Sequence, residues 1–175
     1  MGKGKRYHYF VEGECEKKLI SILKEQKNQI VPGKIDVLDV TKEHLTELKL
    51  RPLPDGVILI LIFDTDTQET RILRENLVFL NSYQRIKEVW CILWCIPQVK
   101  NLEDELVRAT NIHNIKELLD SDGVNKFKAD FIKEKRLFQK LCEKNFDLEK
   151  MWSSKPGKKY DGIGNDGTKI KMRLK

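Results

Sequence analysis

The stretch VILILIFDTD, residues 57–66, decides the fold because a run of hydrocarbon side chains ends there in two acids. Every position from Val57 to Phe63 is apolar, which is typical of a strand covered on both faces. Asp64 and Asp66 follow at alternate positions of an extended chain, so their side chains project to the same side with Cα atoms about 6–7 Å apart. Two acids at the end of a buried strand are unfavourable by themselves, so we look in the rest of the chain for groups that could meet them.

Apolar segments that predict strands alternate with amphipathic segments that predict helices. Strands are predicted over 6–13, 35–40, 57–66 and 88–96, and helices over 14–29, 41–49 and 70–86. Alternation of strands with helices of roughly 10–17 residues is typical of βαβ units and a parallel sheet. The sequence therefore predicts an α/β fold with a four-stranded, mainly parallel, Rossmann-like sheet flanked by helices.

After Pro97 the pattern becomes helical. Helices are predicted over 102–110, 114–121 and 127–145. The end of the chain is rich in glycine and lysine and is expected to form a hairpin or a mobile tail. We divide the chain into an α/β domain at 1–110, a helical extension of that domain at 111–152 and a basic tail at 153–175.

Positive charge gathers at the two ends of the chain. The 175 residues include 33 Lys and Arg against 27 Asp and Glu, a net charge of +6. Seven of the basic residues lie in 155–175 beside only two acids, and three more lie in 3–6. Basic ends on a nearly neutral body favour a polyanionic partner, although terminal lysines also serve simply to keep a protein in solution.

Other features narrow the class of protein. No apolar run reaches 18 residues and the N-terminus lacks the apolar core of a secretory signal, so we expect a cytoplasmic protein without a membrane partner. The four cysteines form neither a CxxC pair nor a disulfide-like framework, and Cys91 and Cys95 are expected in the core. The three scattered histidines do not suggest a zinc site.

Acids recur where the predicted strands end. Glu12 ends the first strand with Glu16 one helical turn beyond it, and Glu103 and Glu105 follow the last strand. In a doubly wound sheet these positions meet at the ligand-binding edge, where a hard divalent cation such as Mg²⁺ relieves the charge. Taken singly, the Asp64 segment is an ordinary helix cap or turn, and an acid such as Glu16 complements a helix dipole.

The segments FVEGECE (10–16) and ILIFDTD (60–66) together resemble the Toprim domain of topoisomerases, bacterial primases and small nucleases. VEGxxE and LEDELV (102–107) most resemble the overcoming-lysogenization-defect and other phage-defence nucleases of that family. The resemblance covers about 6–110. It implies that Mg²⁺ or Mn²⁺ binds Glu12, Asp64 and Asp66, that Glu12 is also a general acid or base, and that Glu16 and Glu103 complete a second metal site.

The resemblance also implies a substrate and partners. The substrate is DNA or RNA, the reaction is phosphodiester hydrolysis, and the nuclease works beside an ATPase or another defence-system protein. Such nucleases often add a lysine that stabilises the phosphate. Lys135 is the candidate because it falls within the apolar stripe of Phe131 and Phe138 on the predicted helix 127–145, where it either snorkels or reaches the carboxylates.

The basic ends would hold phosphates, and aromatic residues near the ends could stack on bases. The candidates are Tyr7, Trp152 and Tyr160, although Trp152 is better explained as a core residue. GIGNDG (162–167) matches GxGxxG but follows no strong strand, so it is interpreted as a turn.

Two other functions stay open. The first is a non-catalytic subunit that binds metal and nucleic acid. The second is a small-molecule phosphatase with Asp64 as nucleophile, which FDTDTQ resembles, although Gln68 stands where that signature has Thr or Val. A glycosyltransferase DxD is disfavoured because the chain is short for two nucleotide-sugar subsites.

Overall fold

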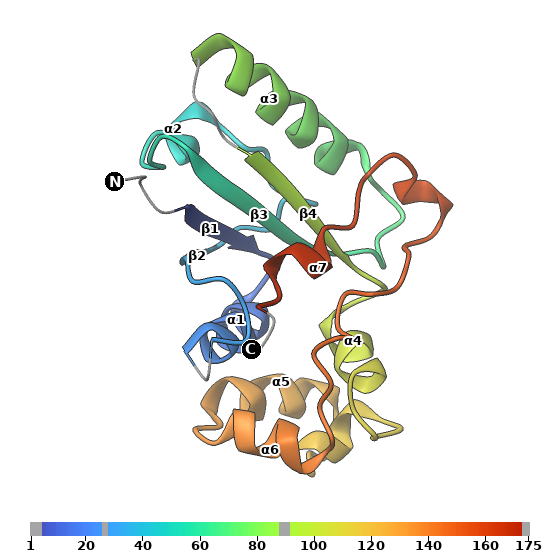
Figure 1. The fold of residues 1–175 in the computed structure, drawn as a ribbon. Helices are drawn as coiled ribbons and strands as arrows, with labels where there is room; N and C mark the ends of the chain where they lie inside the picture. The colour runs from blue at the N-terminus through green and yellow to red at the C-terminus, as the bar shows by residue number, and fades with distance from the viewer. Residues whose placement is uncertain (1–4, 26–27, 88–91, 173–175) are drawn as a thin grey trace.

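The computed structural model describes residues 5–25, 28–87 and 92–172 and has the predicted α/β architecture (Figure 1). All four strands are parallel and run in the order β2-β1-β3-β4. Their bounds are β1 Arg6–Val11, β2 Lys34–Val37, β3 Val57–Asp64 and β4 Ile92–Gln98. The first part of the predicted strand 88–96, including Cys91, lies outside the described residues.

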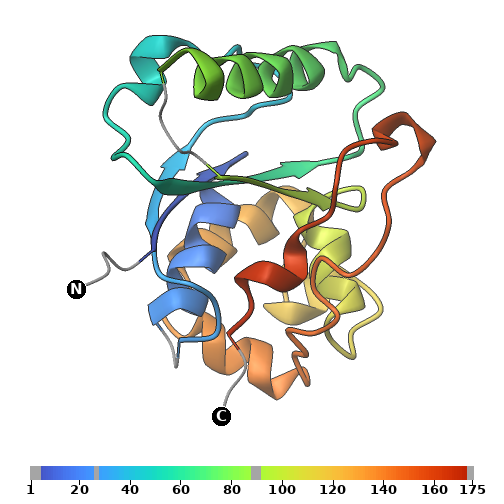
Figure 2. The same cartoon turned by 45° about the horizontal axis from the view of Figure 1, so that its top comes forward.

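The helices form two layers on either side of this sheet. Their bounds are α1 Glu14–Glu25, α2 Glu47–Leu50, α3 Arg71–Lys87, α4 Leu102–Arg108, η1 Ile115–Leu118, α5 Val124–Lys133, α6 Leu137–Glu143, η2 Lys158–Tyr160 and α7 Gly167–Ile170. Figure 2 shows α2 and α3 on one face and α1, α4, α5 and α6 on the other. Among the described residues, no helix is both long and apolar enough to cross a membrane.

The strand β3 divides its side chains between two hydrophobic cores. Ile58, Ile60 and Ile62 pack under α1 and the C-terminal helices, whereas Leu59, Leu61 and Phe63 pack under α3. This is why the segment is apolar at every position, as a central parallel strand has to be. The first core also contains Phe127, Leu141 and Trp152, so the helical extension shares the core of the sheet.

Two helix predictions are wrong in detail. Only the last three residues of the segment 41–49 are helical: α2 begins at Glu47 with Thr46 as its N-cap, while Thr41 donates its backbone N–H and hydroxyl to Asp39. The predicted helix 127–145 is two helices, α5 and α6, separated by a turn at 134–136.

The described part of the tail 153–175 contains two short helices, η2 and α7, so the prediction of a hairpin is wrong. Asp166 pairs with the free edge of β4, since its backbone N–H donates to Cys95 O at 2.8 Å and its Oδ2 accepts from Cys95 N at 2.9 Å. Beyond it, Ile170 is fully buried and its carbonyl accepts from Val31 N. The tail therefore covers an edge that would otherwise expose unpaired backbone groups.

Candidate functional site: an acid cluster at the carboxyl edge

An acidic side chain stands at or just after the end of three of the four strands, at the carboxyl edge of the sheet. Glu12 comes directly after β1, Asp39 comes two residues after β2, and Asp64 is the last residue of β3. Asp39 was not predicted, because IDVLD has the alternation of an ordinary half-buried strand. We use the name acid cluster for these six residues: Glu12, Glu16, Asp39, Asp64, Asp66 and Glu103.

Asp64 lies at the centre of the acid cluster. Its side chain is largely buried, and its Oδ1 atom has no hydrogen-bond partner. Burial, together with the negative charges of four other acids, raises the pKa of Asp64 to about 9; these acids are Glu12, Glu16, Asp66 and Glu103. The five acids that the sequence predicted to meet are therefore close enough to interact electrostatically.

Glu12 is fixed by its neighbours on both sides. Its Oε2 accepts from the backbone N–H of Asp64 at 2.9 Å, which ties the end of β1 to the end of β3. Its Oε1 lies 3.4 Å from the Lys42 ammonium, which also contacts Asp39 Oδ2 at 2.7 Å. Burial raises the pKa of Glu12 despite these two favourable contacts. Lys42 thus places a positive charge at the cluster that sequence reasoning did not find.

Glu16 reaches the cluster from the first turn of α1. A Cβ atom on Gly13 would lie 3.0 Å from Glu16 Oε2, so the glycine leaves room for this carboxylate above the strand-to-helix bend. Glu16 is only 8% exposed. Burial, together with the charges of Glu12 and Glu103, raises its pKa to about 7. Glu16 therefore gains and loses a proton near neutral pH.

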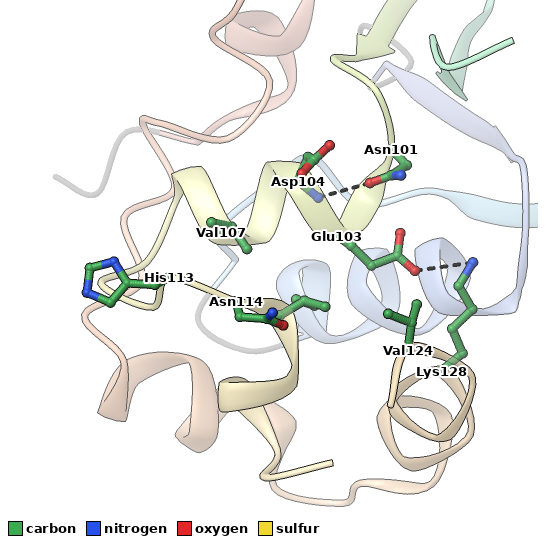
Figure 3. A pocket seen from close by; sticks show the side chains of 9 residues that line it. Asn101, Glu103, Asp104, Val107, His113, Asn114, Val124 and Lys128 are labelled. Atoms are coloured by element: carbon green, nitrogen blue, oxygen red, sulfur yellow. Dashed lines mark hydrogen bonds and ion pairs between the residues drawn. The ribbon is translucent and has the colours of Figure 1, made fainter. Parts of the chain in front are cut away.

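Glu103 joins the acid cluster to a pocket of about 370 Å³ between α4 and α5. Figure 3 shows Glu103 and Lys128 at one end of this pocket and His113 at the other. The Glu103 carboxylate contacts Lys128 Nζ at 3.2 Å, and this interaction raises the pKa of Lys128 although partial burial opposes it. Val107 and Val124 give the pocket apolar walls, with Val124 beside Glu103 and Lys128.

Glu105, two residues further on, serves the fold. It is fully buried and accepts hydrogen bonds from Val99 N at 2.8 Å and Trp152 N at 2.9 Å. Arg108 contacts the same carboxylate at 2.7 Å. The side chain of Glu105 thus holds the end of β4 and the start of the C-terminal segment against α4.

The geometric reason for choosing Lys135 is wrong. Lys135 lies in the exposed turn between α5 and α6 rather than on an apolar helix face. It lines a separate surface hollow beside Asp130 and Arg136. No interaction between Lys135 and the acid cluster is present among the described residues. Lys42 and Lys128 are the lysines that contact the cluster, and only folding brings them there.

Two of the three predicted stacking residues are buried, and the third packs against another aromatic ring. Trp152 and Tyr160 are 1% and 2% exposed, and Tyr7 packs against Trp94 with ring centroids 5.8 Å apart. The interpretation of Trp152 as a core residue is confirmed. Tyr160 stacks on Phe63 beneath the sheet edge, and burial raises the pKa of its hydroxyl together with the charge of nearby Asp66.

The donor set of the acid cluster fits a hard divalent cation. Carboxylate oxygens are the ligands that Mg²⁺ and Mn²⁺ prefer, and the unpartnered Asp64 Oδ1 is available for coordination. Within the described part of the chain, no group of three or more His, Cys, Asp or Glu side chains stands in a metal-holding arrangement. Uncompensated carboxylates repel one another, so a bound cation would have to draw these oxygens together.

No protein-family model, curated protein or solved structure matches the chain. The resemblance to Toprim nucleases therefore stays a prediction based on the quoted motifs. The functional argument rests on the arrangement of the residues: six acids and two lysines converge at the ligand-binding edge of a parallel sheet.

Proposed function

We propose that this protein is a Toprim-like nuclease that uses a divalent cation to hydrolyse phosphodiester bonds in nucleic acid. One observation carries the proposal: Asp64 is buried among acids with an unpartnered Oδ1, and its pKa is raised to about 9. A fold tolerates such an arrangement at a cost, and perturbed carboxylates of this kind gather at functional sites. The FVEGECE and IFDTD motifs of the same residues support the assignment.

Glu12, Asp64 and Asp66 would hold the cation, with Glu16 and Glu103 available for a second one. A bound Mg²⁺ or Mn²⁺ supplies charge for the phosphate oxygens and acidifies a water molecule. The side chains of the protein then have to move the proton. If only one cation binds, Glu16, with a pKa of about 7, can accept a proton from water at neutral pH and release it again. Glu12 is the alternative base, and the Asp64 N–H fixes its orientation.

Lysines near the acid cluster are placed to contact phosphates. Lys42 is largely exposed beside Glu12, and Lys128 lies over Glu103. Lys159 contacts Gln68 in the loop that follows Asp66, so the basic tail runs past the same edge. Contacts of this type bind the backbone of DNA or RNA with little sequence preference and weaken as salt is added.

The pocket beside Glu103 offers a place for the nucleotide next to the cleaved bond. Its volume of about 370 Å³ lies within the usual range for small-molecule sites. Val107 and Val124 provide apolar walls, while His113 and Asn114 provide polar edges. An ATPase or another defence-system partner belongs to the same proposal through the resemblance.

The phosphatase alternative has less support from the sequence, because Gln68 stands where that signature has Thr or Val. The non-catalytic subunit remains the second candidate, because its acid cluster could bind a structural cation in the same way. Alanine at Asp64 would abolish turnover in a nuclease and would leave nucleic-acid binding intact in the non-catalytic protein.

The first test is a cleavage assay on supercoiled plasmid, single-stranded DNA and total tRNA with Mg²⁺, Mn²⁺ or EDTA. We expect cation-dependent cleavage by the wild type and by the control Asp122→Asn, whose carboxylate is exposed and pairs with Lys126. Asp64→Asn should reduce the rate by at least about 10²-fold. Cleavage that persists in EDTA, or equal rates for both variants, would reject the proposal. Binding of nucleic acid without cleavage would favour the non-catalytic subunit.

A further inference from the structure

A second unpartnered polar side chain stands beside Asp64. Gln98, the last residue of β4, is fully buried, and neither its Oε1 nor its Nε2 has a hydrogen-bond partner. Buried amides are normally paired, because loss of hydration without a replacement hydrogen bond costs free energy. The Gln98 amide therefore carries an uncompensated cost of burial, which a bound ligand could offset.

The strand register places Gln98 next to Asp64. The two residues are direct partners in the parallel β3–β4 pair, whose strands lie about 4.8 Å apart. Ile62 and Ile96, two positions earlier, are also partners, and both face the core under α1 and α4. Because side chains alternate along a strand, Asp64 and Gln98 project from that same face.

The backbone around Gln98 is fixed, so the side chain cannot leave by movement of the strand. Its carbonyl accepts from Thr65 Oγ1 at 2.8 Å. The next residue, Val99, donates its N–H to Glu105 at 2.8 Å and accepts from Arg108 at 2.7 Å. These hydrogen bonds hold Gln98 at the edge of the acid cluster from both sides.

We propose that Gln98 is a cation-binding residue of the acid cluster, whose amide oxygen acts as a neutral ligand beside Asp64. Amide oxygens are hard ligands that suit Mg²⁺ and Mn²⁺. A neutral donor adds coordination without adding to the repulsion among the six acids. One cation between β3 and β4 would satisfy Asp64 Oδ1 and Gln98 Oε1, the two buried side-chain oxygens left unpartnered in the described residues. This inference rests on the cation that the proposed function requires.

The test exploits the opposite effects that an apolar replacement should have on stability and on binding. Gln98→Met keeps the length of the side chain and removes the unpaired amide, so without cation its Tm should rise by about 2–4 °C. The Tm increase that Mn²⁺ produces should shrink, because the apparent affinity for Mn²⁺ should fall about tenfold. Gln98→Glu keeps an oxygen at the same position and should retain the Mn²⁺-dependent increase.

The full-length chain is titrated with MnCl₂ in a thermal-shift experiment. Gln139→Met, on the exposed face of α6, is the matched control. Asp64→Asn is the variant expected to lose cation binding. Unchanged Mn²⁺ affinity in Gln98→Met would overturn the role of Gln98, while the acid cluster would remain a cation-binding site. If Gln98→Met has a lower Tm than the wild type without cation, or fails to fold, the amide is a structural group and the proposal is overturned. If Gln98→Glu loses as much Mn²⁺ affinity as Gln98→Met, the side-chain oxygen is not a ligand, and the proposal is overturned as well.

The same titration separates this inference from the proposed nuclease activity. If the wild type shows no Mn²⁺-dependent increase in Tm, cation binding by the acid cluster and the role of Gln98 are both rejected. If Mn²⁺ binds as expected and no nucleic acid is cleaved, the cation site including Gln98 stands, and the nuclease assignment fails.

Discussion

Glu105 on α4 and Asp64 at the end of β3 are two carboxylates largely shielded from solvent, and their surroundings differ completely. The Glu105 side chain is fully buried and receives hydrogen bonds from Val99 N, Trp152 N and Arg108. Asp64 has one oxygen without any partner, and four other acids raise its pKa. The first carboxylate stabilises the folded chain, whereas the second is held in a place where its charge is unfavourable.

The difference shows that burial of an acid does not by itself mark a functional site. What distinguishes the two carboxylates is whether the protein provides partners for the charge. A satisfied carboxylate such as Glu105 cannot take a ligand without losing hydrogen bonds, while Asp64 can gain interactions by binding one.

Removal of the Glu105 carboxylate should have the largest effect on stability. Glu105→Ala leaves two backbone N–H groups and the Arg108 charge without their acceptor, so we expect a loss of about 3–5 kcal/mol in the free energy of unfolding. Urea denaturation measures it. Asp104→Ala, in the same helix turn but partly exposed and 3.5 Å from Lys100, should cost about 0–1 kcal/mol. Equal losses in the two variants would remove the structural role of Glu105.

Asp64 should show the opposite behaviour, in a pH-dependent way. Its pKa is raised in the folded state, so the folded protein binds the proton more tightly than the unfolded chain. The stability that the proton provides is fully present below about pH 4 and is lost as pH rises toward 9. At pH 7 the cost of the acid is at most about 4 kcal/mol, since one pKa unit corresponds to about 1.4 kcal/mol. Asp64→Asn removes this cost.

Thermal melts in EDTA between pH 5 and 9 measure this effect. The Tm of the wild type should fall over the range, and Glu16, with a pKa of about 7, adds to the decrease with the same sign. Asp64→Asn should be more stable than the wild type at pH 8, with a flatter profile, while Asp122→Asn should follow the wild type. Parallel profiles for the wild type and Asp64→Asn would mean that Asp64 has a partner after all.

The fold could be predicted because buried strands are recognisable in the sequence as runs of apolar residues. The apolar run at 57–63 allows only a strand covered on both faces, and the four-stranded parallel sheet follows from its alternation with helices. The split of 127–145 was missed because Phe131, Phe138 and Cys142 have helical spacing. The buried residues are in fact Leu137 and Leu141, so the apolar stripe shifts by one residue after Phe131 and the chain must turn.

The tail was misjudged for a different reason. Its composition of glycine and lysine describes the side chains that face solvent, whereas its order comes from a few backbone and side-chain contacts. Asp166 pairs with β4, and Gly167 packs so closely that a Cβ atom would lie 2.7 Å from the Trp152 carbonyl oxygen. Such contacts link residues far apart in the chain, so neither composition nor periodicity indicates them.

The acids of the site were predictable where a motif or a strand end named them, and Glu12, Asp64 and Asp66 do come together. The positive charges were not. Lys42 reaches the cluster because Asp39 binds Thr41 and turns the chain after β2. Lys128 reaches it because α5 packs on α1 and brings its ammonium to Glu103. Counter-charges of this kind depend on packing between elements and leave no pattern in the sequence.

The smallest predicted effect concerns Lys42, the partner that Asp39 has and Asp64 lacks. Burial opposes ionisation of Asp39, but hydrogen bonds from Lys42 and Thr41 outweigh it and lower the pKa of Asp39. Lys42→Met should therefore raise the pKa of Asp39 and bring it closer to the state of Asp64. The free energy of unfolding should fall by only about 0.2–1 kcal/mol, because the Lys42 side chain is 71% exposed.

An NMR titration of the side-chain carboxyl carbons measures the pKa of Asp39 in the wild type, Lys42→Met and Lys42→Arg. The arginine variant keeps the positive charge and should leave the pKa of Asp39 below its ordinary value. If Lys42→Met leaves that pKa unchanged, Thr41 alone holds the Asp39 charge, since its N–H and hydroxyl both donate to Oδ1. Lys42 could then leave Asp39 and contact a phosphate without destabilising the fold. This result would support a role of Lys42 in substrate binding and would argue against a role in holding the charge of Asp39.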